Sequence, residues 1–222
     1  MALTKESVFN KYIDEISEER ERRLIGLNKV DIRAEYLWKE ALNTVSVEEK
    51  NELITAYDYA KTITYDHPGL SAEIYFTHPL RVASYAILLA DEFPVEAGKV
   101  GLLHNVFEVS TTSSDDIDQR FGKEVSFIIE ALTVDRALQW DVSYKKEYYK
   151  SINSLPKYAR NVKVIDKFDN LFVIGLNPDP DVRSKYLSEI KQYIVPIIKK
   201  DLPYMFSYFS RLIINCEKTE KL

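Results

Sequence analysis

The sequence predicts an all-α fold, and three observations support this. Glycine and proline are scarce, with 6 and 8 among 222 residues, whereas turn-rich β-proteins need many of both. Apolar residues recur at helical spacing along nearly the whole chain. No internal repeat, low-complexity tract or clear linker divides the sequence. We therefore expect residues 1–222 to form a single helical domain, a compact multi-helix bundle.

The N-terminal part predicts three helices. Residues 1–25 are rich in charge and place a narrow apolar stripe at helical spacing, which is typical of a solvated helix that packs one face. Two further helices are expected over 31–43 and 46–64. The second begins with Ser46 and has Glu49 three residues later, which is a capping-box pattern.

Residues 65–79, YDHPGLSAEIYFTHP, predict a loop because two His-Pro pairs and a glycine interrupt the periodicity. Pro79 is expected to begin a strongly apolar helix. Residues 95–109 predict the next helix, and 115–133 predict another after the polar link STTSSDD. The tyrosine-rich region 135–158 predicts a looser segment.

Towards the C-terminus, ARNVKVIDKFDNLFVIG (159–175) predicts a helix and LNPDPD a turn. Pro196 and Pro203 should kink or end the last two helices. The closing segment PYMFSYFSRLII, residues 203–214, is most simply a core helix, and helix-mediated homodimerisation is the alternative.

Charge and composition limit the classes of partner. The net charge of −5 gives no global attraction to nucleic acid or to an anionic membrane. No run of about 18 apolar residues predicts a membrane span, and the N-terminus lacks the apolar core of a signal peptide. Cys216 is the single cysteine, so an internal disulfide is excluded and a reducing cytoplasm is expected. A local basic pocket remains possible, and the sequence predicts a soluble cytoplasmic domain.

The polar residues that could carry chemistry form two helical pairs. All three histidines of the chain lie within residues 67–104. His104 and Glu108 are four residues apart, as are Asp166 and Asn170, so each pair should share a helix face. Histidine nitrogens and a carboxylate that converge from separate helices can bind a divalent cation, and a nearby glutamate can take a proton from water.

Spacing alone leaves a plainer interpretation open. A histidine before proline, as at His78, usually marks a helix entry. His104 within GLLHNVF could be a hydrogen-bonded core histidine, and Asp166 could simply pair with a lysine. On this hypothesis the chain is a helical scaffold whose histidines only pack.

The combination of motifs resembles a known family. YFTHPLRVASYAILLADEF, VGLLHNVFEVSTTSSDDIDQRFG and VKVIDKFDNL stand in an order and at a spacing similar to the hydrolase domain of the RelA/SpoT group, within the HD superfamily of metal-dependent phosphohydrolases. The resemblance covers about residues 57–176. It implies that His78, His104 and Asp166 bind a metal ion, usually manganese in that family, and that Asn170 lies near the substrate.

Two departures from the family pattern concern its acidic residues. The family's His-Asp doublet is His104-Asn105 here, and its acidic pair is Glu108-Val109. Asn105 offers a neutral oxygen and is therefore expected to be a weak fourth ligand. Glu108 would orient or deprotonate the attacking water, whereas Val109 cannot move a proton.

A third departure concerns the loop before the first metal ligand. It reads DHPGLSAEIYFT, and its His67 stands about where the family has a basic residue that contacts the base. The resemblance implies that His67 and Lys167 contact substrate. It also implies a phosphohydrolase that acts on a nucleotide or another phosphorylated small molecule, with guanosine 3′-diphosphate alarmones as the typical case. The alternative is a degenerate member that binds a nucleotide or a protein partner without turnover.

Overall fold

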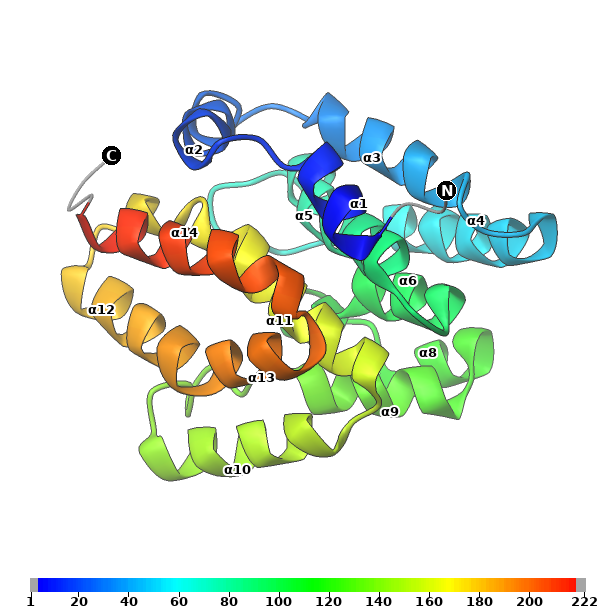
Figure 1. Ribbon diagram of the computed structural model, residues 1–222. Coiled ribbons are helices and arrows are strands. Elements are labelled where there is room, and N and C mark those ends of the chain that lie inside the picture. Colours follow the sequence, from blue (N-terminus) through cyan, green and yellow to red (C-terminus); the bar gives the residue numbers. More distant parts are fainter. Residues whose placement is uncertain (1–3, 219–222) are drawn as a thin grey trace.

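The computed structural model describes residues 4–218, and this part of the chain is helical without a β-strand (Figure 1). The all-α prediction is confirmed, and residues 1–3 of the first predicted helix lie outside the described residues. The elements are α1 (Lys5–Tyr12), α2 (Ile16–Ile25), α3 (Ile32–Leu42), α4 (Val47–Thr62), α5 (Ala72–Leu89), α6 (Pro94–Leu103), α7 (Val106–Val109), α8 (Ser114–Phe121), α9 (Lys123–Leu132), α10 (Val142–Ser154), α11 (Lys157–Leu171), α12 (Pro180–Glu189), α13 (Val195–Asp201) and α14 (Phe206–Lys218). Short 3₁₀ turns cover Ile174–Leu176 and Pro203–Met205, and a π-helical turn covers Ile190–Ile194.

Helix α11 lies at the centre of the bundle. It packs against α5 and α6 on one side and against α13 and α14 on the other (Figure 1). Phe168 of α11 is fully buried, and its ring contacts Phe9, Phe172 and Phe209. Burial of one such side chain contributes about 1.5–3 kcal/mol to stability. The site residues carried by α11 therefore sit on an element that is packed on two sides.

Helix α5 begins earlier than predicted. Its N-cap is Ser71, whose hydroxyl accepts a hydrogen bond from the backbone N–H of Ile74, so the helix starts at Ala72 and Pro79 lies within it. The prediction that Pro79 begins the helix is wrong. A proline inside a helix removes the N–H that would have bonded four residues back, and its ring crowds the carbonyl there. The buried apolar faces of α5 outweigh that cost. His78 therefore lies almost two turns inside a buried helix, not at its entrance.

Two predicted helices are each divided in the structure. The helix expected over 95–109 ends at Leu103, and α7 resumes at Val106 after a turn in which Asn105 has φ −104° and ψ 0°. The helix expected over 115–133 breaks at Gly122, whose φ of 87° is open to glycine without strain. The His104-Asn105 doublet thus lies in the turn between α6 and α7, so His104 and Glu108 do not share one continuous helix as predicted.

The segment 135–158, predicted to be loose, contains α10. The Asp141 side chain caps this helix by accepting from the N–H of Tyr144 at 2.7 Å. Burial of Tyr149 against Tyr193, with ring centroids 4.4 Å apart, stabilises it. Tertiary packing of tyrosines therefore orders a stretch whose apolar periodicity is weak.

The remaining elements follow the sequence closely. The capping box of Ser46 and Glu49 is present at the start of α4. Pro196 stands in the first turn of α13, directly after the π-helical turn, and α13 ends before Pro203. Helix α14 buries one apolar face, including Cys216, as a core helix does. Within residues 4–218, no helix is both long and apolar enough to cross a membrane. The single domain and the homodimer stay predictions.

Candidate metal and active site

Three side chains from three parts of the chain converge beside α11. His78 comes from α5, His104 from the turn after α6, and Asp166 from α11. One potential ligand atom of each lies within 4.8 Å of the other two. The Nε2 atoms of His78 and His104 lie 3.4 and 3.6 Å from Oδ1 of Asp166. A single ion with bonds of about 2.0–2.2 Å can bridge atoms at such separations.

The hydrogen bonding of the two imidazoles fits a metal ion. Nδ1 of His78 lies 2.7 Å from a carboxylate oxygen of Asp169, and Nδ1 of His104 lies 2.8 Å from the carbonyl oxygen of Gly101. Both acceptors draw the ring proton to Nδ1, which leaves each Nε2 with a free lone pair. Both Nε2 atoms are buried and without a hydrogen-bond partner in the structure. Buried polar atoms are normally paired, and a bound cation would satisfy both.

Charge at this cluster comes from Asp166. Its Oδ1 accepts a hydrogen bond from the Asn170 amide at 2.7 Å, and its Oδ2 pairs with Lys163 at 3.4 Å. Burial raises the pKa of Asp166, but Lys163 and the two histidines outweigh burial and hold this pKa well below its usual value. Asp166 is therefore ionised and supplies the one anionic oxygen among the three convergent ligands.

Asn105 and Glu108 lie beside the cluster, each with a partner. The Asn105 amide nitrogen donates to the Tyr75 hydroxyl at 2.9 Å. One Glu108 oxygen accepts from the N–H of Val134 at 3.0 Å, and the other pairs with Arg136 at 2.6 Å. The Glu108 side chain is 4% exposed, whereas that of Arg136 is 65% exposed. Glu108 therefore forms a buried wall of the site, and the exposed Arg136 side chain covers it on the solvent side.

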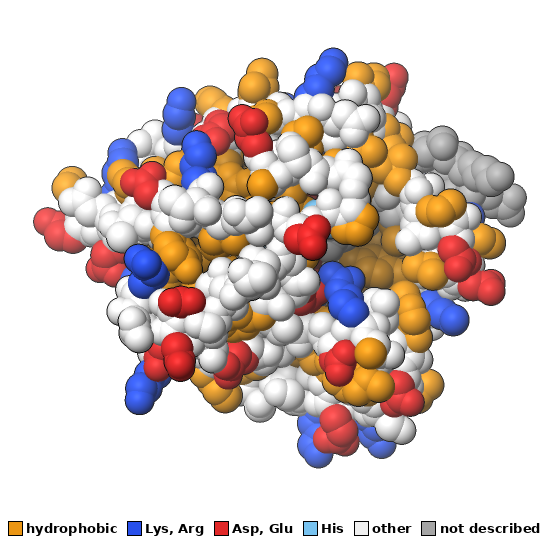
Figure 2. Space-filling model, turned by 180° about the vertical axis from the view of Figure 1, so that it is seen from behind, with side chains coloured by type: hydrophobic (Ala, Val, Ile, Leu, Met, Phe, Trp, Pro, Cys, Tyr) orange, Lys and Arg blue, Asp and Glu red, His pale blue; other side chains and the backbone are white. Residues whose placement is uncertain are grey.

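The cluster lies at the base of a cleft of about 1660 Å³. Basic, acidic and apolar side chains are interspersed around a hollow on the face shown in Figure 2. His104 itself is 1% exposed and lies beneath the cleft surface. Every other residue predicted to act on metal or substrate lines the cleft, namely His67, His78, Asn105, Glu108, Asp166, Lys167 and Asn170.

Comparison with family models finds no match to the chain, whereas individual known proteins are similar to it. The chain is 26% identical over 153 residues to guanosine-3′,5′-bis(diphosphate) 3′-pyrophosphohydrolase of Aquifex aeolicus, covering 68% of the chain and 21% of that protein. It is 30% identical over 149 residues to GTP pyrophosphokinase rsh of Brucella melitensis, covering 64% of the chain and 19% of that protein. The chain thus spans about one fifth of these curated relatives.

A solved structure shares the fold. It is described as a metazoan orthologue of SpoT that hydrolyses ppGpp and plays a role in starvation responses. The TM-score is 0.57 at 19% identity, and the match covers 79% of the chain and 98% of that structure. The chain is similar in sequence to RelA/SpoT-type proteins and in fold to a SpoT-type hydrolase. The expected resemblance and the HD-like helical fold are confirmed.

Two further residues of this RelA/SpoT-like domain were predicted to contact substrate. The His67 ring packs on Tyr75, with centroids 5.0 Å apart, and burial lowers the pKa of His67. Lys167 pairs with Glu189 at 3.2 Å and lies over the Tyr186 ring. Both side chains line the cleft; Lys167 is paired with Glu189, whereas Nδ1 of His67 is buried without a hydrogen-bond partner.

The polar residues behind His78 were not predicted from the sequence. Asp169 and Arg81 form an ion pair next to this histidine, and Arg23 of α2 joins them. Helical spacing could have indicated the first two, because Asp169 follows Asp166 by three residues and Arg81 follows His78 by three. No sequence signal places Arg23 there, because its position depends on how α2 packs on the bundle.

Proposed function

We propose that the chain is an HD-type metal-dependent phosphohydrolase. Its proposed substrate is a nucleotide with a 3′-pyrophosphate, such as guanosine 3′,5′-bis(diphosphate). The observation that carries this proposal is the pair of buried, unpartnered Nε2 atoms of His78 and His104 beside the ionised Asp166. The names of the relatives supply the substrate class.

His78, His104 and Asp166 would hold the ion, and the Asn105 amide oxygen would be a weak fourth ligand. The resemblance favours Mn²⁺. A divalent cation supplies Lewis acidity and makes a water molecule more acidic at neutral pH. With only three strong protein ligands, the site resembles catalytic centres that leave a position for water or substrate.

The chain's own residues would bind and orient the reactants. In the proposed hydrolysis, the oxygen of water forms a bond to the phosphorus attached to the 3′-oxygen, and the bond between that phosphorus and the 3′-oxygen breaks. The products are pyrophosphate and a nucleotide with a free 3′-hydroxyl. Glu108 would accept a proton from the water. Asn170 would position the substrate, and His67 and Lys167 would contact its base and phosphates.

A second candidate function is nucleotide binding without turnover. The observation that favours it is the state of the acidic pair: Glu108 is engaged by Arg136 and the Val134 N–H, and Val109 packs into the core. Such a protein would keep the cleft but lack a group free to move a proton.

Measuring pyrophosphate release from guanosine 3′,5′-bis(diphosphate) with and without Mn²⁺ distinguishes the hydrolase function from the binding function. The hydrolase proposal predicts Mn²⁺-dependent release that is lost in His104→Ala and in Glu108→Ala. Release that is absent from the wild-type protein, together with nucleotide binding in calorimetry, would instead establish the binding function.

A further inference from the structure

The buried carboxylate of Asp169 connects His78 to the N-terminal helices. One oxygen lies 2.7 Å from Nδ1 of His78 and 2.9 Å from Nη2 of Arg81. The other oxygen lies 2.9 Å from Nε of Arg81 and 2.9 Å from Nη1 of Arg23. Asp169 is 3% exposed, so these contacts are shielded from solvent. A carboxylate in a fork-like contact with one guanidinium and a close contact with a second has little freedom to turn.

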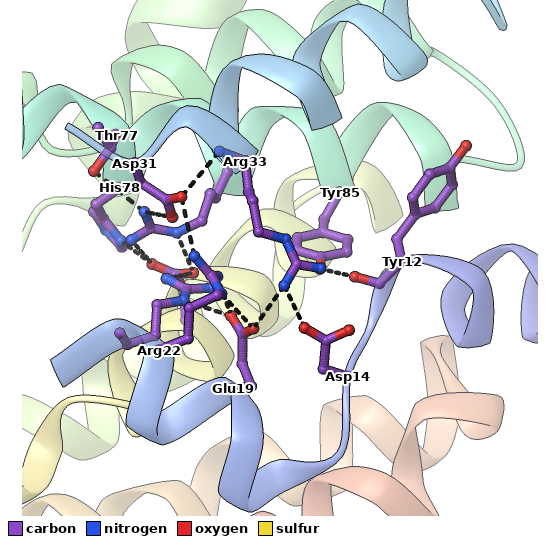
Figure 3. Close-up of polar contacts among 12 residues, drawn as sticks. Tyr12, Asp14, Glu19, Arg22, Asp31, Arg33, Thr77, His78 and Tyr85 are labelled. Carbon is purple, nitrogen blue, oxygen red and sulfur yellow. Dashed lines mark hydrogen bonds and ion pairs between the residues drawn. The ribbon is translucent and has the colours of Figure 1, made fainter. Parts of the chain in front are cut away.

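The two arginines are in turn held by acidic residues of the N-terminal segment. Arg23 of α2 pairs with Glu19 one turn earlier, and Arg81 pairs with Asp31, the N-cap of α3, at 3.1 Å. Arg22 bridges Glu19 and Asp31 at 2.7 and 3.0 Å. Figure 3 shows this continuous set of contacts reaching from α2 and α3 to His78 on α5. Three carboxylates and three guanidinium groups therefore balance in charge, which makes their burial tolerable.

The position of Asp169 decides which nitrogen of the His78 ring has a free lone pair. Because an ionised carboxylate can only accept a hydrogen bond, the ring proton of neutral His78 must lie on Nδ1. Nε2 then points away from Asp169, towards His104 and Asp166, with its lone pair free. A carboxylate behind a metal-binding histidine fixes the tautomer and the orientation of the ring and makes it a better ligand.

We propose that Asp169, held by Arg23 and Arg81, is a positioning residue that presents Nε2 of His78 to the metal cluster. Helix α2, which lies outside the stretch 57–176 that carries the motifs, is thereby part of the site. The inference rests on the proposed function in one respect: the orientation of His78 serves metal binding only if the proposed metal centre exists. The tautomer and orientation of His78 can be tested without any metal.

The first test compares Asp169→Asn with Asp31→Asn. Each change removes one carboxylate that pairs with Arg81, but only Asp169 contacts His78. In Asp169→Asn the arginines retain the amide oxygen, and the amide N–H groups face Nδ1. This arrangement favours the opposite tautomer. Long-range ¹H–¹⁵N spectra of the metal-free proteins at about pH 9, where a histidine is neutral, should show a proton on Nδ1 of His78 in the wild type and in Asp31→Asn, and on Nε2 in Asp169→Asn.

The second readout is Mn²⁺ affinity measured by calorimetry on the folded proteins. Loss of such a supporting carboxylate typically weakens metal binding by about 10–100-fold, and we expect this for Asp169→Asn. Asp31→Asn should stay within about threefold of the wild type, a change of less than about 0.7 kcal/mol. If Asp169→Asn does not fold, Arg23→Gln serves instead, because it keeps Asp169 and removes the contact that α2 makes with it, together with the pair of Arg23 with Glu19. It should weaken Mn²⁺ binding by roughly three- to tenfold, short of the loss expected when the supporting carboxylate itself is removed.

Unchanged tautomer in Asp169→Asn, or equal Mn²⁺ affinity in both Asp variants, would overturn the positioning role. Failure of the proposed function can be distinguished from failure of the positioning role, because the wild-type protein would then bind no Mn²⁺. In that case the spectra still decide the inference, since a tautomer that depends on Asp169 supports it and one that does not overturns it.

Discussion

The side-chain amide of Asn105 donates a hydrogen bond to the hydroxyl of Tyr75, with 2.9 Å between Nδ2 and Oη. The Tyr75 ring also packs against His67 and lies 6.2 Å from the His78 ring, so it forms one wall of the candidate site. The amide nitrogen of Asn105 is therefore engaged, and its oxygen is the atom that can face a cation. The family aspartate at this position would bring a negative charge.

Asn105→Asp should bind Mn²⁺ more tightly than the wild type. The Tyr75 hydroxyl can turn its proton to donate to the new carboxylate, so the local geometry can persist. A second anionic oxygen near the ion should raise the affinity by roughly tenfold, about 1.4 kcal/mol. Calorimetric titration measures this. Asn51→Asp, on the exposed side of α4, adds the same charge far from the cluster and should leave the affinity unchanged. Equal or weaker binding by Asn105→Asp would count against Asn105 as a ligand.

Glu108→Gln separates catalysis from binding. Glutamine can still accept the Val134 N–H, and loss of the pair with the largely exposed Arg136 should cost less than about 1 kcal/mol. If Glu108 is the base, pyrophosphate release should fall by about 10²–10⁴-fold, with Mn²⁺ affinity unchanged. Single-turnover assays at saturating substrate measure this loss. Full activity in Glu108→Gln would assign the proton transfer to another group.

Gly101→Ala tests the close packing that brings His104 to His78. A Cβ at Gly101 would lie 2.6 Å from Cα of Ala83, in the backbone of α5, so the helices must separate. We expect a loss of about 1–3 kcal/mol in the free energy of unfolding in urea, and weaker Mn²⁺ binding. Gly98→Ala is the matched control, because its Cβ would meet only the flexible side chains of Leu53 and Ile87. Gly98→Ala should retain Mn²⁺ affinity, and a similar affinity loss in both variants would contradict this prediction.

Glu189 should make stability depend on pH in acid. Burial raises its pKa, but Lys167 and Lys145 lower it more, from 4.5 to about 2. A depressed carboxyl pKa contributes stability that is complete above the unfolded value and is lost as the pH falls from about 4.5 to about 2. The contribution at neutral pH is about 3 kcal/mol.

Glu189→Gln should therefore be less stable at pH 7 and should show a flatter decline in stability below about pH 4.5. Urea unfolding between neutral and acid pH measures both effects. The control is Glu52→Gln, since Glu52 is 58% exposed and pairs with Lys99 at the surface. Its loss should cost less than about 1 kcal/mol. Identical acid profiles for Glu189→Gln and the wild type would contradict the proposed role of this buried pair.

The convergence of His78, His104 and Asp166 agrees with the sequence prediction because that prediction rested on the order and spacing of the motifs, not on helix boundaries. The boundaries near them were less predictable. Pro79 resembles a helix start, but the hydroxyl of Ser71 caps the helix earlier. The turn at Asn105 could not be predicted, because the apolar pattern of residues 95–109 continues across it.

The long-range ion pairs around the site could not be predicted from local sequence patterns. Asp169 and Arg23 are far apart in sequence, and their contact arises only when α2, which packs on α14, is placed so that Arg23 reaches α11. The ion pair of Lys167 with Glu189 likewise depends on the placement of α12 beside α11. Such long-range contacts of charged side chains follow from tertiary packing and leave no periodic signal in the sequence.

Mn²⁺ binding to the wild-type protein and to His104→Ala tests the central claim most directly. The free Mn²⁺ signal in electron paramagnetic resonance reports how much ion each protein takes up. Because Nε2 of His104 is one of three convergent ligand atoms, the wild-type chain should bind one Mn²⁺ ion and His104→Ala should lose this site. No uptake by the wild type, or equal uptake by both proteins, would contradict a metal centre at His78, His104 and Asp166.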